Sequence, residues 1–431
     1  MSTQSLLERR FRVLGQHSPL FYDEPLQLVR GEGVWLYDVE GKRYLDAYNN
    51  VPHVGHCHPR IVEALYRQAA TLNTHTRYLD DTVVTYAERL LSTFHEPLTN
   101  VFFCCTGTES NELALRIARE CTGGQGIICT AWAYHGNSAA VSQISSLFTP
   151  AEKRGPYVRA IPVLDPYRQR QGRDDATLAT AYAQDVQNAI DDFKRNGVKF
   201  AGLLICTALS SEGLPAVPNG YLAQVVDIVH GAGGLFIADE VQAGFGRFGS
   251  HMWGHQMLGG QADIVTMGKP MGNGHPLAGV VARADLVEEF TSQNMYFNTF
   301  GGNPVSAAVG LAVLQVLEEE RLLENARRVG EYVIAGLEKL KTRHPLIGDV
   351  RGRGLFFAVE MVRDPATKEP AGAETKRIVN GMRERGVLIS RIGPHDNILK
   401  IRPPMPFNTD NADLLLQTLD DVMTGLRSPS D

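Results

Sequence analysis

The chain has 431 residues, which is enough for two or three domains that each build a core. Charged residues make up 21% and the formal net charge is −6, and because the basic residues are scattered we expect neither a nucleic-acid nor a membrane partner. The N-terminus lacks the apolar core of a signal peptide and the six cysteines form no CxxC pair, so we expect a cytoplasmic protein with reduced thiols.

An N-terminal hairpin is the first predicted element. Residues 33–50 alternate apolar or aromatic with polar residues around the turn signal EGK, which is the period of a β-hairpin. The histidines of the next segment, His53, His56 and His58, crowd together as metal ligands would. A helix is predicted to start at Pro59, so we interpret the segment as a strand-to-helix turn and expect no metal site.

The rest of the chain divides by pattern. Over residues 60–310, short continuous apolar runs alternate with amphipathic stretches, which predicts a large α/β domain with a parallel sheet buried on both faces. Residues 311–431 change to an α+β pattern and are expected to form a smaller domain. Residues 1–59 are expected to be an N-terminal segment whose hairpin packs with that smaller domain.

Polar residues follow four of the apolar runs, at the strand ends where open α/β sheets bind ligands. Gly107 and Thr108 open a helix after NVFFCC, and their backbone N–H groups, the hydroxyl and the positive helix end suit a phosphate. Tyr134 and His135 follow GIICT and offer flat side chains. Considered alone, Gly107 and Thr108 could equally form a helix cap, and Tyr134 could equally be a residue of the hydrophobic core.

An acid and a lysine end two further runs. Asp239 closes GLFIAD, and Lys269 follows DIVTMG about one β-α-β crossover later. Singly, Asp239 also reads as a helix cap or ion-pair partner, and Lys269 as a solvated turn residue. Together with the phosphate cradle and the aromatic face, they match the needs of pyridoxal 5′-phosphate (PLP): an anchor, a ring stack, a pyridinium partner and a Schiff-base amine. Partial burial of Lys269 would lower its pKa for work as nucleophile and base.

Six motifs, spread along almost the whole chain, occur in the same order as in a known enzyme family. NNVPHVGHCHP, TGTESNELALRIAR, AYHG, FIADEVQAGFGRFG, TMGKPMGNGHP and NTFGGNPVSAAVG together resemble the class III PLP-dependent aminotransferases of fold type I. The resemblance implies an α/β fold with a mostly parallel sheet flanked by helices in the large domain. It also implies a homodimer or a dimer of dimers with active sites at the subunit interface.

The resemblance further implies the cofactor contacts. By role, these are Gly107 and Thr108 at the phosphate, Tyr134 stacked on the ring, Val241 behind the ring, Gln242 near the ring hydroxyl, Asp239 at the pyridinium nitrogen, Lys269 at the Schiff base, and Thr299 at the phosphate of the neighbouring subunit's cofactor. The catalytic residues among them are Lys269 and Asp239.

Two positions depart from aminotransferases that handle α-amino acids. Those enzymes carry an arginine just before a PP pair, where this chain has Lys400, with Arg402 two residues further on. They also carry a glutamate that gates this arginine, where this chain has Cys206 or Thr207. Together with VGHCHP, LNTHTRYL and LKIRPPM, these departures resemble the phospholyase subgroup, and most closely the enzyme that acts on O-phosphoethanolamine.

The predicted function is therefore β-elimination of phosphate from O-phosphoethanolamine, which gives acetaldehyde, ammonia and phosphate. One alternative is an ω-amine or amino-acid aminotransferase with a keto-acid acceptor, and another is a 5-phosphohydroxylysine phospholyase. A third alternative, a non-catalytic PLP-sensing regulator, would need a basic DNA-binding module, and none precedes the hairpin at Gly33.

A phospholyase must hold a phosphate dianion instead of a carboxylate. Arg77 is the first candidate because a guanidinium grips phosphate with two hydrogen bonds, and Lys400 is the second as a point charge. Asn50 and Tyr22 are candidates for neutral donors. The alternative interpretation of Arg77 is a surface ion pair with an aspartate of the same turn, Asp80 or Asp81.

Overall fold

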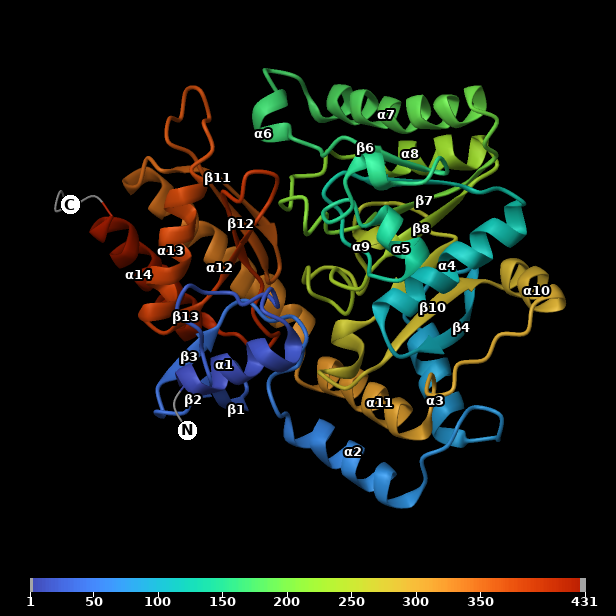
Figure 1. Cartoon of the computed structure of the whole chain (residues 1–431), viewed down its shortest axis with the longest axis horizontal. Helices are drawn as coiled ribbons and strands as arrows, with labels where there is room; N and C mark the ends of the chain where they lie inside the picture. The colour runs from blue at the N-terminus through green and yellow to red at the C-terminus, as the bar shows by residue number, and fades with distance from the viewer. Residues whose placement is uncertain (1–2, 427–431) are drawn as a thin grey trace.

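The structure is a computed structural model that describes residues 3–426. Its largest sheet has the strand order β4-β10-β9-β8-β7-β5-β6 and helices on both faces (Figure 1). In chain order the strands are β4 (Leu98–Cys104), β5 (Gly126–Thr130), β6 (Val158–Ile161), β7 (Phe200–Cys206), β8 (Leu235–Asp239), β9 (Ile264–Met267) and β10 (Ala278–Arg283). Within this sheet β10 runs antiparallel to both neighbours and the other strands share one direction, which confirms the predicted mostly parallel α/β sheet.

Strand β7 shows why the apolar runs are continuous. All its residues are buried, and neighbouring side chains serve different cores: Leu203 packs on one face of the sheet and Leu204 on the other. A strand covered by helices on both faces has no solvent side, so it needs apolar residues at every position.

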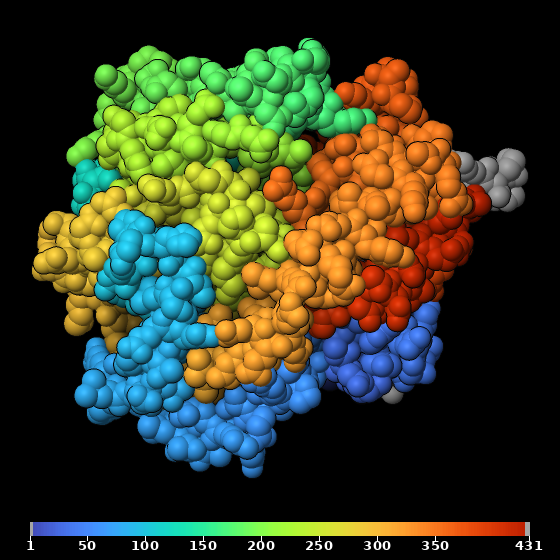
Figure 2. Space-filling model, turned by 180° about the vertical axis from the view of Figure 1, so that it is seen from behind, coloured from blue at the N-terminus to red at the C-terminus, as the bar shows by residue number. Residues whose placement is uncertain are grey.

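Helices form the layers around this sheet and much of the C-terminal region. They are α1 (Thr3–Leu14), α2 (Pro59–Thr71), α3 (Asp81–Leu91), α4 (Gly107–Thr122), α5 (Ala139–Ile144), α6 (Pro166–Gln169), α7 (Asp175–Arg195), α8 (Tyr221–Gly231), α9 (Gly254–Met257), α10 (Ala284–Gln293), α11 (Pro304–Glu319), α12 (Leu322–Arg343), α13 (Gly372–Glu384) and α14 (Thr409–Gly425), with short 3₁₀ turns η1 (Ala151–Lys153) and η2 (Lys269–Gly272). Helix α11 packs against α2 and α3, and Figure 2 shows its orange residues beside their blue ones. None of the helices between residues 3 and 426 is long and apolar enough to cross a membrane.

Two smaller sheets lie beside the large one. The first has the order β1-β2-β3-β13, and the second has the order β11-β12-β15-β14. Their strands are β1 (Leu28–Glu32), β2 (Trp35–Asp38), β3 (Arg43–Asp46), β11 (Ile347–Arg353), β12 (Phe356–Met361), β13 (Val387–Leu388), β14 (Ser390–Ile392) and β15 (Ile398–Ile401). Because β13 pairs in parallel with β3, the N-terminal hairpin lies against the C-terminal helices, as Figure 1 shows.

The three crowded histidines lie on the chain between β3 and α2, and each has a different partner. His53 Nε2 lies 2.7 Å from the Phe245 carbonyl oxygen, His56 Nε2 lies 2.6 Å from an Asp46 carboxylate oxygen, and His58 pairs with Glu320, the residue after α11. The rings of His53 and His58 therefore join the N-terminal segment to the rest of the molecule, and the ring of His56 makes a contact within that segment.

Candidate active site

The carboxyl ends of four parallel strands meet at one cavity. Strands β4, β7, β8 and β9 end at the same edge of the sheet, and the segment after β5 joins them there. The cavity is lined by Thr106, Gly107, Thr108, Tyr134, His135, Gly136, Cys206, Asp239, Val241, Gln242 and Lys269. All the predicted cofactor contacts except Thr299 therefore surround a single space.

One wall of the cavity is the start of α4. Thr106 caps the helix, since its side chain accepts from the Glu109 N–H while the Glu109 carboxylate accepts from the Thr106 N–H. Two glycines keep this wall bare: a Cβ on Gly107 would lie 3.1 Å from Val241, and one on Gly136 would lie 2.5 Å from the Thr108 hydroxyl. Bare N–H groups at a helix N-terminus of this kind suit a phosphate.

Asp239 lies at the buried end of β8 and is held by three donors. Asn111 Nδ2 donates to its Oδ2 at 3.1 Å, His135 Nδ1 lies 2.6 Å from the same oxygen, and the Val241 N–H donates to Oδ1 at 3.0 Å. Thr266 in turn donates to the Asn111 side-chain oxygen at 2.7 Å. This network fixes the carboxylate in one orientation, and sequence reasoning missed the parts of Asn111 and His135 in it.

Lys269 opens the turn η2 directly after β9. It has a φ of 34°, a left-handed conformation that costs energy for a residue with a Cβ and that gathers at functional sites. Burial lowers the pKa of Lys269, while nearby Asp239 raises it and nearby Arg402 lowers it. The chain thus places an amine that loses its proton readily at the lip of the cavity.

Two cavity residues have contacts that bear on their predicted roles. The ring of half-buried Tyr134 meets Phe148 edge-on, with centroids 5.5 Å apart. Gln242, predicted near a ring hydroxyl, accepts a hydrogen bond from Arg402 through its side-chain oxygen. The cavity is therefore linked directly to Arg402, the residue that follows strand β15.

Strand β15 and the residue after it bring two buried basic side chains toward the cavity. Lys400 and Arg402 alternate along the chain, so they share a face. Lys400 Nζ donates to the Ser210 carbonyl oxygen at 3.1 Å, and the Arg402 guanidinium carbon lies 4.6 Å from the centre of the Tyr48 ring. Within residues 3–426 neither side chain forms an ion pair with a carboxylate, and Arg402 Nε has no hydrogen-bond partner.

Glu212 is a buried acid that the sequence interpretation overlooked. Thr130 donates to its Oε1 at 2.5 Å, and its Oε2 has no partner among the described residues. Burial raises the pKa of Glu212, which the nearby His135 and Lys400 lower only in part. The available signal was its place in SSEG, shortly after β7.

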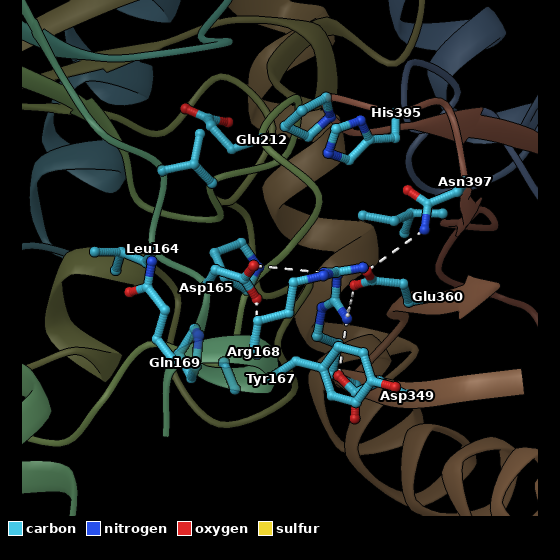
Figure 3. Close-up of a pocket in the computed structure, with 17 residues that line it drawn as sticks. Leu164, Asp165, Tyr167, Arg168, Gln169, Glu212, Asp349, Glu360, His395 and Asn397 are labelled. Atoms are coloured by element: carbon cyan, nitrogen blue, oxygen red, sulfur yellow. Dashed lines mark hydrogen bonds and ion pairs between the residues drawn. The ribbon is translucent and has the colours of Figure 1, made fainter. Parts of the chain in front are cut away.

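A second cavity adjoins Glu212 between the large sheet and the β11-β12 sheet (Figure 3). There Glu360 binds two arginines: Arg168 at 2.5 Å and Arg351 at 2.9 Å. Arg351 also donates to the carbonyl oxygens of Gly213 and Leu214, next to Glu212 in the chain. Figure 3 shows Glu212 apart from Arg168 and Glu360, so the Arg168 guanidinium does not form an ion pair with the Glu212 carboxyl group.

Arg77 and Thr299 lie on the surface, outside the cavity of their own chain. The Arg77 guanidinium carbon lies 3.9 Å from the centre of the Phe297 ring, and Thr299 is exposed two residues further along. The alternative ion-pair interpretation of Arg77 finds no support at Asp80, whose side chain caps α3 by accepting from the Val83 N–H.

The two predicted neutral donors differ in their contacts. Asn50 is buried, and among the described residues neither its amide nitrogen nor its amide oxygen has a hydrogen-bond partner. A buried polar group without partners is costly, so this amide remains a candidate for a ligand contact. Tyr22 donates its hydroxyl to the Ile389 carbonyl oxygen at 3.1 Å, which leaves its oxygen only as an acceptor.

Comparison with known proteins gives the family. Residues 21–423 match the model of the class-III aminotransferases. The chain is similar to a phospholyase from Arthrobacter, solved in complex with phosphoethanolamine, with 48% identity, a TM-score of 0.94 and coverage of 97% of this chain and 99% of that one. An ethanolamine-phosphate phospho-lyase homolog of Caenorhabditis elegans is 36% identical over 98% of this chain and 94% of its own length.

Another relative carries an aminotransferase name. The alanine-glyoxylate aminotransferase 2-like protein of Drosophila melanogaster is 40% identical over 99% of this chain and 88% of its own length. The chain belongs to the class-III aminotransferase family, whose members are PLP-dependent enzymes, and it has the α/β fold of their fold type I. The resemblance that its motifs carry is thereby confirmed.

Proposed function

We propose that this protein is a PLP-dependent phospholyase that eliminates phosphate from O-phosphoethanolamine. The observation that carries the proposal is the pair of buried basic side chains, Lys400 and Arg402, that lie beside the cavity without a carboxylate partner among the described residues. A buried basic side chain that carries its charge is normally paired with an acid, so this pair suits an anionic ligand. The similarity to the Arthrobacter phospholyase supports the same reading.

The residues around the cavity fit PLP. The bare start of α4 at Gly107 and Thr108 would hold the phosphate, and the buried, fixed Asp239 would hold the protonated ring nitrogen. Tyr134 and Val241 would flank the ring, and His135 Nε2 is a buried atom without a partner on this side of the cavity. Lys269 would attach the cofactor through its amine.

Lys269 would carry out the proton transfer of the elimination. When bound, PLP supplies a sink for the electrons of the C–H bond that breaks. Lys269 Nζ, whose pKa is lowered by burial, takes that proton from the carbon bearing the substrate nitrogen. The C–O bond of the adjacent carbon breaks and phosphate departs with the electron pair. Water then completes the release of acetaldehyde and ammonia, so one water is consumed for each phosphate freed.

The phosphate subsite would consist of groups that hold a dianion. Arg402 offers a guanidinium with an unpartnered Nε, and Asn50 offers an amide without partners. Lys400, on the same strand face as Arg402, adds an amine. Charge-assisted hydrogen bonds from a guanidinium are the strongest of these contacts, so Arg402 would contribute most of the affinity.

We further propose a homodimer in which Arg77 and Thr299 serve the partner's site. Around them, large apolar side chains are exposed, among them Tyr78 at 67%, Leu79 at 104% and Phe300 at 71%. Large apolar side chains that are exposed near one another favour an interaction surface. In a two-fold dimer each subunit would present this patch to the other.

Replacing Arg77 by alanine is expected to raise the KM for O-phosphoethanolamine by about 100-fold, because a charge-assisted pair with phosphate is lost. The KM for an unphosphorylated amine such as ethylamine should change little. Steady-state kinetics with both amines test this, and equal effects on the two would remove Arg77 from the phosphate subsite.

Complementation tests whether Arg77 acts across the interface. If it does, co-expressing the Arg77→Ala and Lys269→Ala chains yields hybrid dimers with one intact site, and about a quarter of the wild-type activity should return. Activity that stays at the level of the two separate variants would place Arg77 in its own subunit's site or outside any site.

The test of the proposed function is turnover of O-phosphoethanolamine by the PLP-loaded enzyme with no keto acid present. Repeated release of phosphate and acetaldehyde in equal amounts is expected. A transaminase would stop after one half-reaction, so activity that needs a keto acid and another amine would make the protein an aminotransferase. Faster phosphate release from 5-phosphohydroxylysine would mean that the preferred substrate is different but that the protein is still a phospholyase.

A further inference from the structure

Burial holds the pKa of the Lys400 amine well below its ordinary value. Among the described residues this amine donates only to the Ser210 carbonyl oxygen, and it lies 5.8 Å from the centre of the Phe356 ring, which β12 contributes. The side chain is 4% exposed, so water reaches it poorly. A lysine ammonium in such a place has lost its hydration without gaining a counter-ion.

The charged groups around Lys400 add to this effect. Arg402, two residues further along the chain, and Lys269 at η2 repel an ammonium where they carry their charge, and both act to lower the pKa of Lys400. Cys206 at the end of β7 is a thiol whose pKa burial raises to about 12, so it carries no charge near neutral pH. Burial also raises the pKa of the nearby acid, Glu212, and no ion pair joins it to Lys400.

We propose that Lys400 is a conditional cation, a neutral amine in the ligand-free site that takes up a proton when a dianionic group binds beside it. This inference rests on the proposed function, because it concerns the phosphate subsite of the same cavity. Lys400 is thereby a specificity-determining residue.

The physical reason is the charge of the ligand. A group with two negative charges between Lys400 and Arg402 repays the cost of charging a second buried cation, whereas a carboxylate with one charge is already satisfied by Arg402. A permanently charged arginine at this position would attract both. Lys400 therefore selects phosphate over carboxylate, because it binds an anion well only when it is protonated, and only a dianion stabilises that protonated form.

Sulfate binding to the PLP-loaded enzyme tests the inference. Sulfate keeps two charges between about pH 7 and 9, so a bound proton must be taken by the protein, and sulfate affinity should fall as the pH rises across this range. Calorimetry in two buffers of different ionisation enthalpy should count one proton taken up. Binding with no proton uptake and no pH dependence overturns the inference.

Two substitutions assign the proton. Lys400→Met matches the neutral side chain, so it should leave the melting temperature of the ligand-free enzyme unchanged while sulfate binds weakly and without uptake. Lys400→Arg should bind sulfate without pH dependence and bind acetate about tenfold more tightly. Unchanged proton uptake in Lys400→Met would place the proton elsewhere and overturn the inference.

Glu212→Gln is the matched control for the neighbouring acid. Burial raises the pKa of Glu212, and the proposal assigns the proton to Lys400, so this variant should take up the same proton as the wild type. Proton uptake that appears in Glu212→Gln but not in the wild type would mean that Glu212 supplies the proton in the wild type. That result would overturn the inference that the proton comes from solvent. Phosphate release from O-phosphoethanolamine is assayed separately, so a working phospholyase without sulfate-linked uptake would refute this inference alone.

Discussion

Replacement of Lys269 by alanine is expected to abolish turnover, with a loss of at least about 10⁴-fold in kcat, the upper range for a positioned general base. The residue would serve twice, since the same amine attaches the cofactor and takes the substrate proton. The visible absorbance of the lysine-linked cofactor should disappear as well. Both readouts come from one purified variant, the first by a phosphate-release assay and the second by a spectrum.

The control for Lys269 is a lysine that lies on the surface of the large domain. Lys194→Ala, at an exposed position on α7, removes the same side chain and should leave both the spectrum and turnover unchanged. Retained phosphate release by Lys269→Ala, at more than a per cent or so of wild type, would overturn the proposed mechanism.

Asp239→Asn should have the second largest effect, a loss of about 10³-fold in kcat, because the protonated ring nitrogen would lose its charged partner in a buried site. The amide has nearly the shape of the carboxylate, so the fold should persist. Its NH₂ would also face the donors that now converge on the carboxylate, His135 and Asn111, and cofactor affinity should fall.

Asp227→Asn, an exposed change of the same chemistry on α8, is the matched control and should be silent in both assays. Cofactor affinity is measured by titrating the apoenzyme with PLP. An Asp239→Asn enzyme with wild-type kcat would show that Asp239 is only a structural hub for His135 and Asn111.

The local part of the architecture was predictable because each strand carries its own signal. The runs that became β7, β8 and β9 are buried at every position and mostly apolar, as burial on both faces requires, and polar residues stand at their carboxyl ends. The start of α11 at Pro304 was also predictable, because an asparagine followed by a proline is typical of a helix N-terminus. In the structure the Asn303 side chain caps the helix by accepting from the Ser306 N–H. The antiparallel course of β10 carried no comparable signal.

The candidate site was predictable only in part. Asp239 and Lys269 stand at strand ends, where residue type and position together suggested chemistry, and they line one cavity. The partners of Asp239 were not predictable. Asn111 lies within α4 and His135 in a loop after β5, and neither position has a local pattern that points to a carboxylate on β8.

The sequence by itself determined the family, the order of strands and helices, and the residues at the strand ends, because these follow from local periodicity and short motifs. Only the tertiary structure decided the electrostatics of the site. Burial and the nearby Arg402 and Lys269 lower the pKa of Lys400, and the groups around its amine, among them Ser210 and Phe356, meet only when the sheets pack together. The pKa of a buried amine depends on everything that excludes water from it, and that is a property of packing across the whole chain.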